Sequence, residues 1–277
     1  MDQRQENVAM LKERARAIRL HIIDLVGTGR AGHLGGSCSA ADVVAALYFG
    51  RMAYRPEDPA WEGRDRLIFS KGHAALCQYA ALCELGVIDQ SALSTVKMLG
   101  SSLQGHPDMT KCPGIEANTG SLGQGLSIAL GMALGLRLDG KEQRVYCILG
   151  DGELAEGQVW EAAMAAAHYK ANNLTAIVDR NGIQATGPVA EIMDVGDVAA
   201  KFRAFGWHAL DIDGHDMEAI LQALDEARRE ADRPTVIVAR TIKGKGVDFA
   251  EGKAAFHNGT LDEEQFAAAK ASICRNA

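Results

Sequence analysis

Residues 144–158, RVYCILGDGELAEGQ, place a short apolar run directly before Gly-Asp-Gly. Such a run predicts a buried strand, and glycines at its end allow a ligand to approach the backbone without meeting a Cβ. A second apolar run, LTAIVD (174–179), leads into Asn181. Residues 155–170, which lie between the two runs, have a helical pattern. The segment therefore predicts two adjacent parallel strands joined by a crossover helix.

The same alternation extends along the chain. Further strands are predicted at 66–69, 207–213 and 234–239, and further helices at 39–49, 73–85, 122–138, 197–205 and 216–230. This order predicts an α/β fold, with a doubly wound, mostly parallel sheet flanked by helices. No linker or repeat divides the sequence, so we expect a single domain over residues 1–277. The long irregular stretch 99–121 is expected to be functional.

Composition restricts the class of protein. The chain has 277 residues and a net charge of −7, without a basic patch, which argues against a nucleic-acid partner. No apolar run approaches the length of a membrane span, and the charged N-terminus does not resemble a signal peptide. The six cysteines show no zinc-type spacing. We expect a soluble cytoplasmic protein with no membrane partner.

The two strand ends predict a metal–diphosphate site. Asp151 and Asn181 follow neighbouring strands, so their oxygen atoms should lie at the same edge of the sheet. With a carbonyl near Ile183 they would supply three hard ligands for Mg²⁺, with Ca²⁺ or Mn²⁺ as substitutes, while a diphosphate and water supply the rest. Gly150 and Gly152 would admit the phosphate oxygens. Either Gly-Asp-Gly or Asn-Gly alone is better explained as a turn, whereas both together, after consecutive strands, favour the metal–diphosphate site.

Several histidines follow glycine in predicted loops. His33 lies in AGHLGG, His73 in SKGHAA and His106 in QGHPD. A neutral imidazole can donate or accept a hydrogen bond near neutral pH, although an isolated loop histidine is often only a surface residue. His215, in DIDGHD, is instead expected to belong to a turn that caps the following helix. Gly131 and Gly135, four residues apart on a helical pattern, predict close helix–helix packing.

The motifs taken together resemble the transketolase family. The matching segments occur in transketolase order: RAGHLGG, SKGHAALCQYA, LQGHPD, NTGSLGQGLSIALGMA, GDGELAEGQVWEA, DRNGIQATG, FGWHALDIDGHD and RTIKGKG. Within them, Gly-Asp-Gly followed about thirty residues later by Asn is similar to the thiamine diphosphate fingerprint. Leu34 and Ser121 stand where many relatives carry proline, which we interpret as marks of a subfamily.

The resemblance implies roles for individual residues. The catalytic residues that contact the donor sugar would be His33, His106 and His257. The implied cofactor-binding residues are His73, Gly120, Leu122, Gly150, Asp151, Gly152, Glu156, Asn181 and Lys243. For Lys243 a solvated loop cation is an equal alternative. By the resemblance, Glu156 would belong to a carboxylate network that joins two active sites, and we favour this interpretation over an acid stabilised by its helix N-terminus. No such role is implied for Glu153.

The resemblance also implies a missing half. In transketolases, a glutamate that activates the cofactor lies in a pyrimidine-binding domain, which a C-terminal domain follows, and neither is found in this sequence. We therefore expect the N-terminal subunit of a split transketolase, active with a C-terminal partner chain and assembled as two copies of each. The expected reaction is transfer of a two-carbon ketol unit between sugar phosphates, by default those of the pentose phosphate pathway. A truncated chain would have the same sequence.

Two alternatives remain open. One is a subunit of another thiamine diphosphate enzyme, similar to 1-deoxyxylulose-5-phosphate synthase or to a dehydrogenase E1 component. The other is a non-catalytic module that binds Mg²⁺ and diphosphate. The choice of donor substrate distinguishes the first, and activity with a partner chain distinguishes the second.

Overall fold

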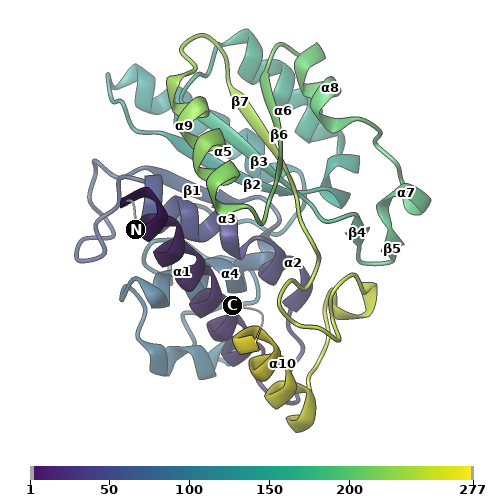
Figure 1. Cartoon of the computed structure of the whole chain (residues 1–277). Helices are drawn as coiled ribbons and strands as arrows, with labels where there is room; N and C mark the ends of the chain where they lie inside the picture. The colour runs from purple at the N-terminus through teal and green to yellow at the C-terminus, as the bar shows by residue number, and fades with distance from the viewer. Residues whose placement is uncertain (1–2, 276–277) are drawn as a thin grey trace.

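The computed structural model describes residues 3–275 and is built around a parallel sheet (Figure 1). Its five strands lie in the order β1 (Arg66–Phe69), β2 (Val145–Gly150), β3 (Leu174–Arg180), β7 (Thr235–Arg240) and β6 (His208–Asp213). Every pairing in this sheet is parallel. All five predicted strands are confirmed, as is the predicted α/β class.

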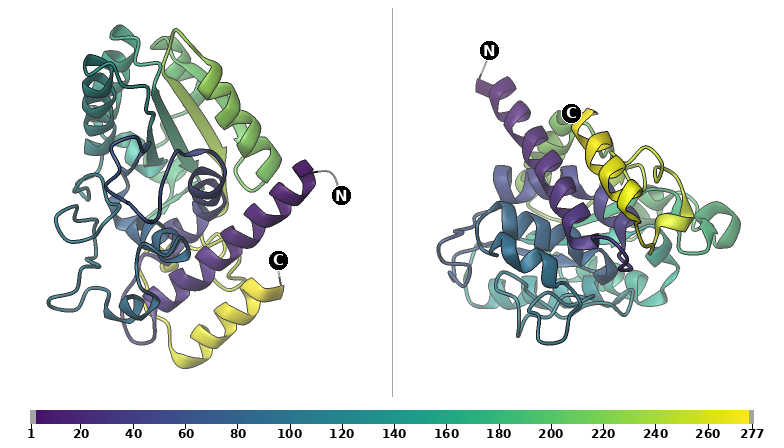
Figure 2. Two further views of the ribbon diagram at one scale, coloured as in Figure 1. Left: turned by 90° about the vertical axis from the view of Figure 1, so that its left-hand side faces the viewer. Right: turned by 90° about the horizontal axis from the view of Figure 1, so that it is seen from below.

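Helices cover both faces of the sheet. On one face lie α1 (Gln3–Val26), α3 (Ala41–Ala46), α4 (Ala75–Glu84) and α9 (Met217–Arg229). On the other lie α5 (Gln124–Leu138), α6 (Gly157–His168) and α8 (Val198–Ala204), as Figure 2 shows from the side. In β2, Tyr146 and Ile148 pack into the first layer, whereas Val145, Cys147 and Leu149 pack into the second. This double burial explains why the strand is apolar throughout.

The remaining elements are short, except the last helix. They are α2 (Leu34–Ser39), α7 (Val189–Ile192), α10 (Glu263–Arg275), the β4 (Ile183–Gln184) and β5 (Gly187–Pro188) hairpin, a π-helical turn (Leu47–Arg51), and 3₁₀ turns at Gly72–Ala74, Gln90–Thr95, Gly152–Ala155 and Ala254–Phe256. Two expectations need correction. The predicted helix 39–49 is divided at Ala40, and the loop predicted around His33 already becomes helical at Leu34, while His73 lies in a 3₁₀ turn.

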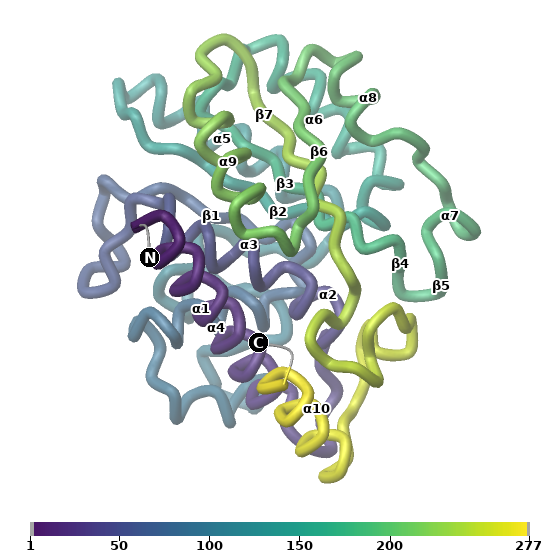
Figure 3. The backbone as a smooth tube through the Cα atoms, viewed as in Figure 1, coloured from purple at the N-terminus to yellow at the C-terminus, as the bar shows by residue number. Residues whose placement is uncertain are grey.

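Segments far apart in sequence meet at one end of the molecule. Helices α1 and α10 pack side by side (Figures 2 and 3). Near them, Gly32 and Gly259 exchange backbone hydrogen bonds of 2.9 and 3.1 Å, and Thr28 forms a bridge with Leu261. This pairing brings the segment that ends at His33 beside the segment that follows His257. Within residues 3–275, no helix combines the length and apolar character needed to cross a membrane.

Candidate functional site

The carboxyl ends of β2 and β3 bring Asp151 beside the turn at 181–183. Gly150 is in register with Asp179, so the residues after each strand start from the same edge. Asp151 is buried, and its Oδ1 accepts a hydrogen bond from Gly152 N at 2.8 Å, while Oδ2 accepts one from Gly182 N. Burial, together with the nearby Asp179 carboxylate, raises the pKa of Asp151. A cation at this carboxylate would reverse that effect.

The turn supplies the other oxygen donors that were predicted. Asn181 Oδ1 accepts a hydrogen bond from Ile183 N at 3.2 Å, and its Nδ2 donates to Asp179 Oδ2 at 3.2 Å. The Ile183 carbonyl accepts a hydrogen bond from Lys243 Nζ at 2.8 Å. Over residues 3–275, no group of three or more His, Cys, Asp or Glu side chains could hold a metal ion. A carboxylate, an amide and a carbonyl instead form the sparse oxygen set that suits Mg²⁺ when phosphate and water complete the shell.

Lys243 is one of the buried cations at this site. Only 2% of the residue is exposed, which shows that the alternative of a solvated loop cation is wrong. Burial and the charge of Lys71 lower the pKa of Lys243 to about 8. Besides the Ile183 carbonyl, Nζ contacts His257 Nδ1 at 3.1 Å. A cation at this position is suited to an anionic ligand.

The histidines of the predicted loops gather in one cluster. The ring of His33 lies 5.1 Å from His73, 6.3 Å from His106 and 5.6 Å from His257, measured between ring centroids. His73 and His257 are 4.9 Å apart. The sequence places these residues in separate segments, so their convergence is a result of the fold.

Three histidines of the cluster, His33, His73 and His257, are kept neutral at physiological pH. Burial and neighbouring positive charge lower the pKa of His33 to about 4, and that of His257 to about 4. For His73, burial and the charge of Lys71 lower the pKa to about 2. The buried Nδ1 of His33 has no hydrogen-bond partner in the described part of the chain. Neutral rings of this kind can both donate to and accept from a bound ligand.

A cavity of about 360 Å³ connects these groups. The predicted residues that line it are His73, Leu122, Gly150, Asp151, Gly152, Glu156, Asn181, Ile183, Lys243 and His257. His33 adjoins it through its ring contact with His73, and His106 lies next to His33. Gly120 supports His106, since a Cβ at Gly120 would lie 2.8 Å from His106 Cδ2. The structure thus brings all predicted site residues to one place.

Sequence reasoning missed a buried ion pair next to the cavity. Lys71 and Asp179, with side chains 2% and 3% exposed, form a salt bridge. Lys71 Nζ also donates to the Gly36 carbonyl at 2.8 Å, and Ser39 Oγ and Thr241 Oγ1 donate to Asp179. Burial alone would raise the pKa of Asp179, but Lys71 and these hydrogen bonds hold it below its usual value. The sequence contains one signal of a buried charge here: in FSKG (69–72), Lys71 stands between a buried strand and a glycine.

Glu153, for which the sequence implied no functional role, has a structural one. Glu153 is buried, and its carboxylate accepts hydrogen bonds from Ser70 Oγ, Gly123 N and Gly150 N. It therefore fixes the loop before α5 against the end of β2. Glu156, which the sequence favoured, is exposed at the N-terminus of α6 and lines the cavity. The motif alone does not show which of these two acids is buried, because that depends on the direction of the 3₁₀ turn between them.

The chain matches the family described as "Transketolase, thiamine diphosphate binding domain" over residues 10–276, which defines its class as a thiamine diphosphate-binding protein. It belongs to the transketolase family. It is 44% identical over 263 residues to the 6-deoxy-6-sulfo-D-fructose transketolase subunit SqwG of Clostridium sp. (strain MSTE9), covering 95% of this chain and 96% of the relative. It is 40% identical to an apulose-4-phosphate transketolase subunit of Phocaeicola vulgatus, covering 90% and 88%.

Longer transketolases match over part of their length. Human transketolase is 40% identical, and the match covers 93% of this chain but 41% of that protein. The crystal structure of a Pichia stipitis transketolase mutant aligns with a TM-score of 0.90 at 32% identity, covering 95% of this chain and 40% of that chain. The Campylobacter jejuni enzyme aligns with a TM-score of 0.89 at 34% identity, covering 96% and 43%. The chain thus spans about two fifths of these proteins.

The residues present fit the cofactor of this family. Oxygen donors and a buried lysine line the same cavity, and the lysine contacts one of the donors, as a site for a metal-bound diphosphate requires. Gly36 and Gly150 line the cavity without a Cβ, which at these positions would stand 3.7 Å from His73 Nε2 and 3.6 Å from Lys71 Cδ, respectively. The unpartnered Nδ1 of His33 provides a polar atom for a bound ligand.

Proposed function

We propose that this chain is the cofactor-binding subunit of a two-chain transketolase, which transfers a two-carbon ketol unit from a ketose to an aldose with thiamine diphosphate and Mg²⁺. The observation that carries the proposal is the cluster of neutral imidazoles beside a cavity lined by Asp151, Asn181 and Lys243. A module that only binds metal and diphosphate has no use for such a cluster.

The cofactor's polar end has a defined set of partners in this proposal. Asp151 Oδ, Asn181 Oδ1 and the Ile183 carbonyl would hold Mg²⁺. Lys243, whose Nζ donates to the Ile183 carbonyl, would supply a positive charge for the diphosphate. Leu122 and Gly120 would contact the aminopyrimidine. When bound, the cofactor supplies the carbon nucleophile, and the protein supplies position and proton control.

The histidines control the sugar. His33, His106 and His257 hydrogen-bond the hydroxyls of the donor ketose and move protons at its oxygens as the carbon–carbon bond breaks. Their lowered pKa values keep His33 and His257 neutral, so each can accept a proton at one nitrogen while donating from the other. His73, with the lowest pKa, remains a hydrogen-bonding group beside the diphosphate.

A second chain completes the active site in this proposal. The relatives named as subunits match this chain over nearly their whole length, whereas longer transketolases match over about two fifths. We expect the partner to carry a pyrimidine-binding domain with the activating glutamate, and two copies of each chain to form a heterotetramer.

The substrate is proposed to be a sugar with an anionic end group. One relative is named for a sulfonated fructose and another for a sugar phosphate, which leaves phosphate and sulfonate as the end groups to compare. Pentose phosphates remain the default pair. A 1-deoxyxylulose-5-phosphate synthase or dehydrogenase E1 activity requires pyruvate or another 2-oxo acid as donor, so donor choice separates these functions.

Replacement of a metal ligand tests the site. Asp151→Ala and Asn181→Ala should each remove Mg²⁺-dependent binding of thiamine diphosphate, measured by titration calorimetry on the chain with its candidate partner. Asp139→Ala, whose side chain is 65% exposed at the end of α5, serves as the matched acidic control. Wild-type affinity in either site variant refutes the assignment.

Mixing tests the two-chain assembly. The chain is purified alone and with the candidate second chain, and ketol transfer from xylulose 5-phosphate or 6-deoxy-6-sulfofructose to an aldose phosphate is followed. Transfer only in the mixture, with no product from pyruvate, supports the proposal. Full activity from the chain alone overturns the two-chain arrangement, and turnover of pyruvate favours the alternative enzymes.

A further inference from the structure

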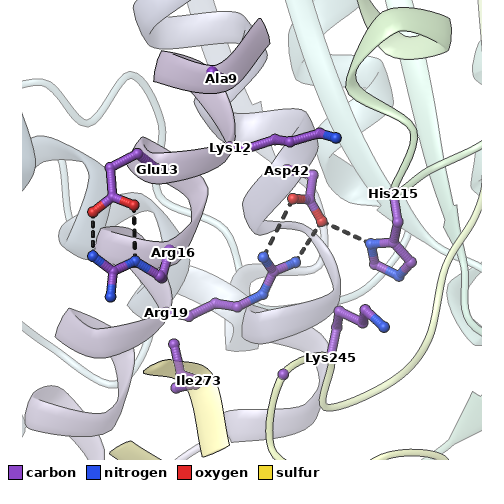
Figure 4. A pocket seen from close by; sticks show the side chains of 10 residues that line it. Ala9, Lys12, Glu13, Arg16, Arg19, Asp42, His215, Lys245 and Ile273 are labelled. Carbon is purple, nitrogen blue, oxygen red and sulfur yellow. Dashed lines mark hydrogen bonds and ion pairs between the residues drawn. The ribbon is translucent and has the colours of Figure 1, made fainter. Parts of the chain in front are cut away.

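The imidazole of His215 joins two parts of the molecule outside the cofactor cavity (Figure 4). Nδ1 lies 2.7 Å from Asp42 Oδ2, and Nε2 accepts a hydrogen bond from the backbone N–H of Ile242 at 2.9 Å. Because an amide N–H can only donate, Nε2 must carry the lone pair and Nδ1 the proton. The hydrogen bonds therefore select one neutral tautomer, which donates to Asp42 and accepts from Ile242.

This imidazole has no part in the local turn that the sequence predicted. Asp213 accepts from the backbone N–H of His215 at 2.8 Å. Asp216 caps α9 through Glu218 N and Ala219 N. The predicted turn and cap are thus confirmed, but aspartates make both. The imidazole of His215 instead contacts Asp42 and Ile242, which are both distant from it in sequence.

The acceptor of the imidazole proton is rigidly held. Asp42, on α3, is buried and pairs with Arg19 of α1 through both carboxylate oxygens. Arg19 Nε also donates to the Cys38 carbonyl at 3.3 Å. Burial would raise the pKa of Asp42, but Arg19 and His215 hold it at about 2, so the carboxylate is ionised. The first helical layer thus provides a fixed anchor for His215.

Through His215, this anchor holds the loop formed by residues 241–246. The loop is tied at one side by Thr241 N, which donates to the Arg180 carbonyl at 3.1 Å, and at the other by Gly244 N, which donates to the Gly35 carbonyl at 2.9 Å. Between them, the bond from Ile242 N to His215 lies directly before Lys243. Lys243 packs against Gly35, where a Cβ would lie 2.9 Å from its Cγ.

We infer that His215, held by Asp42 and Arg19, is a positioning residue that fixes the 241–246 loop and so keeps the Lys243 ammonium in the cofactor cavity. The importance of this for catalysis rests on the proposed function, whereas the tether itself does not. The neighbouring cavity of about 440 Å³, lined by Lys12, Lys245 and His215 among others, leaves space for altered side chains at residue 215.

A pair of neutral amides tests the tether atom by atom. The amide of Asn matches the position of Nδ1, whereas that of Gln reaches the position of Nε2. His215→Asn should therefore retain the donor to Asp42 but lose the acceptor for Ile242 N–H. His215→Gln should retain that acceptor. His208→Phe is the control, because His208 begins β6, the strand that precedes His215, and its Nε2 lies 2.9 Å from Glu226 Oε1 instead of contacting the 241–246 loop.

The first measurements need no cofactor. Hydrogen exchange of the 241–246 backbone amides should accelerate about tenfold in His215→Asn, corresponding to one lost hydrogen bond, and remain near wild type in His215→Gln and His208→Phe. Acylation of Lys243 by an amine-reactive ester, measured by mass spectrometry, should accelerate in the same variant. Exchange within β7 reports whether any variant has lost its global fold. Unchanged exchange and acylation in His215→Asn overturn the inference.

Cofactor affinity then connects the tether to the site. In the assembled enzyme with its native Lys243, His215→Asn should weaken thiamine diphosphate binding several-fold. In a Lys243→Met variant, adding His215→Asn should weaken binding no further. Additive effects of the two substitutions overturn the coupling. If wild-type protein binds no cofactor, the proposed function fails, and exchange with acylation still decides whether His215 positions Lys243.

Discussion

Replacement of Lys71 by methionine provides a strong test of the site's architecture. The substitution removes a cation that is 2% exposed and leaves the Asp179 carboxylate, 3% exposed, with neutral donors only. These are Ser39 Oγ at 2.5 Å, Asn181 Nδ2 at 3.2 Å and the Thr241 hydroxyl. Breaking a buried pair from one side costs about 3–5 kcal/mol. Against a typical total of about 5–15 kcal/mol, Lys71→Met should be folded but markedly destabilised.

The free energy of unfolding is measured by urea titration of the cofactor-free chain at pH 7, with circular dichroism as the signal. Lys71→Met with Asp179→Asn should recover most of the loss, because the buried charge is removed with its partner. Lys111→Met is the control: its side chain is 52% exposed and lies 3.6 Å from Asp108, so it should cost no more than about 1 kcal/mol. A loss below about 1 kcal/mol in Lys71→Met, or no recovery in the double variant, refutes the reasoning.

The pH dependence of the unfolding free energy provides a second test of this prediction. In the wild type the pKa of Asp179 is lowered, so its stabilisation is present at neutral pH and is lost as the pH falls through that lowered pKa. In Lys71→Met only burial and neutral donors act on the carboxylate, and its pKa should rise. The variant's deficit should therefore shrink on acidification from pH 7, since protonation of Asp179 removes the unpaired charge. A deficit that grows on acidification contradicts this account.

Three further results are expected. The unfolding free energy of the wild type should fall as the pH drops below the ordinary histidine value of about 6.5, because unfolding releases His33, His73 and His257 from lowered pKa values; a His73→Asn variant with an unchanged slope contradicts this. Gly35→Ala should weaken thiamine diphosphate binding about tenfold, because the new Cβ would lie 2.9 Å from Lys243 Cγ, displace this lysine and so remove a charge-assisted contact. Calorimetry compares this variant with Gly157→Ala, where a Cβ would meet nothing within 4 Å. Gly131→Ala should stabilise the isolated chain by about 0.5–1 kcal/mol in urea titration, since a Cβ meets nothing within 4 Å there, and destabilisation would show a hidden contact.

Much of the fold was predictable because each strand carries its own signal. The strands are buried on both faces, so they appear as continuous apolar runs, and the helices between them follow. Asp151 and Asn181 could be placed together because parallel strands end at one edge. The sequence does not show where short helices break, and the division at Ala40 was missed for this reason.

The missed parts of the site depend on contacts between distant residues. Lys71 and Asp179 are separated by more than a hundred positions, so neither residue type nor spacing reveals their pairing. Glu153 and Glu156 differ in burial only because of the turn between them. The close helix packing predicted from Gly131 and Gly135 is wrong within residues 3–275, where a Cβ at either position would meet nothing. Local patterns identify such residues but not their neighbours.

The pairing of Gly32 with Gly259 has a consequence for how the protein is made. More than two hundred residues separate these partners, so the first histidine of the cluster emerges from the ribosome long before the last. At about 5–20 residues per second, the interval is about 10–50 s. Strands β1, β2 and β3 can pair in that time, but β7, which lies between β3 and β6, is made only shortly before His257. The sheet and the histidine cluster should therefore be completed at nearly the same late stage of synthesis.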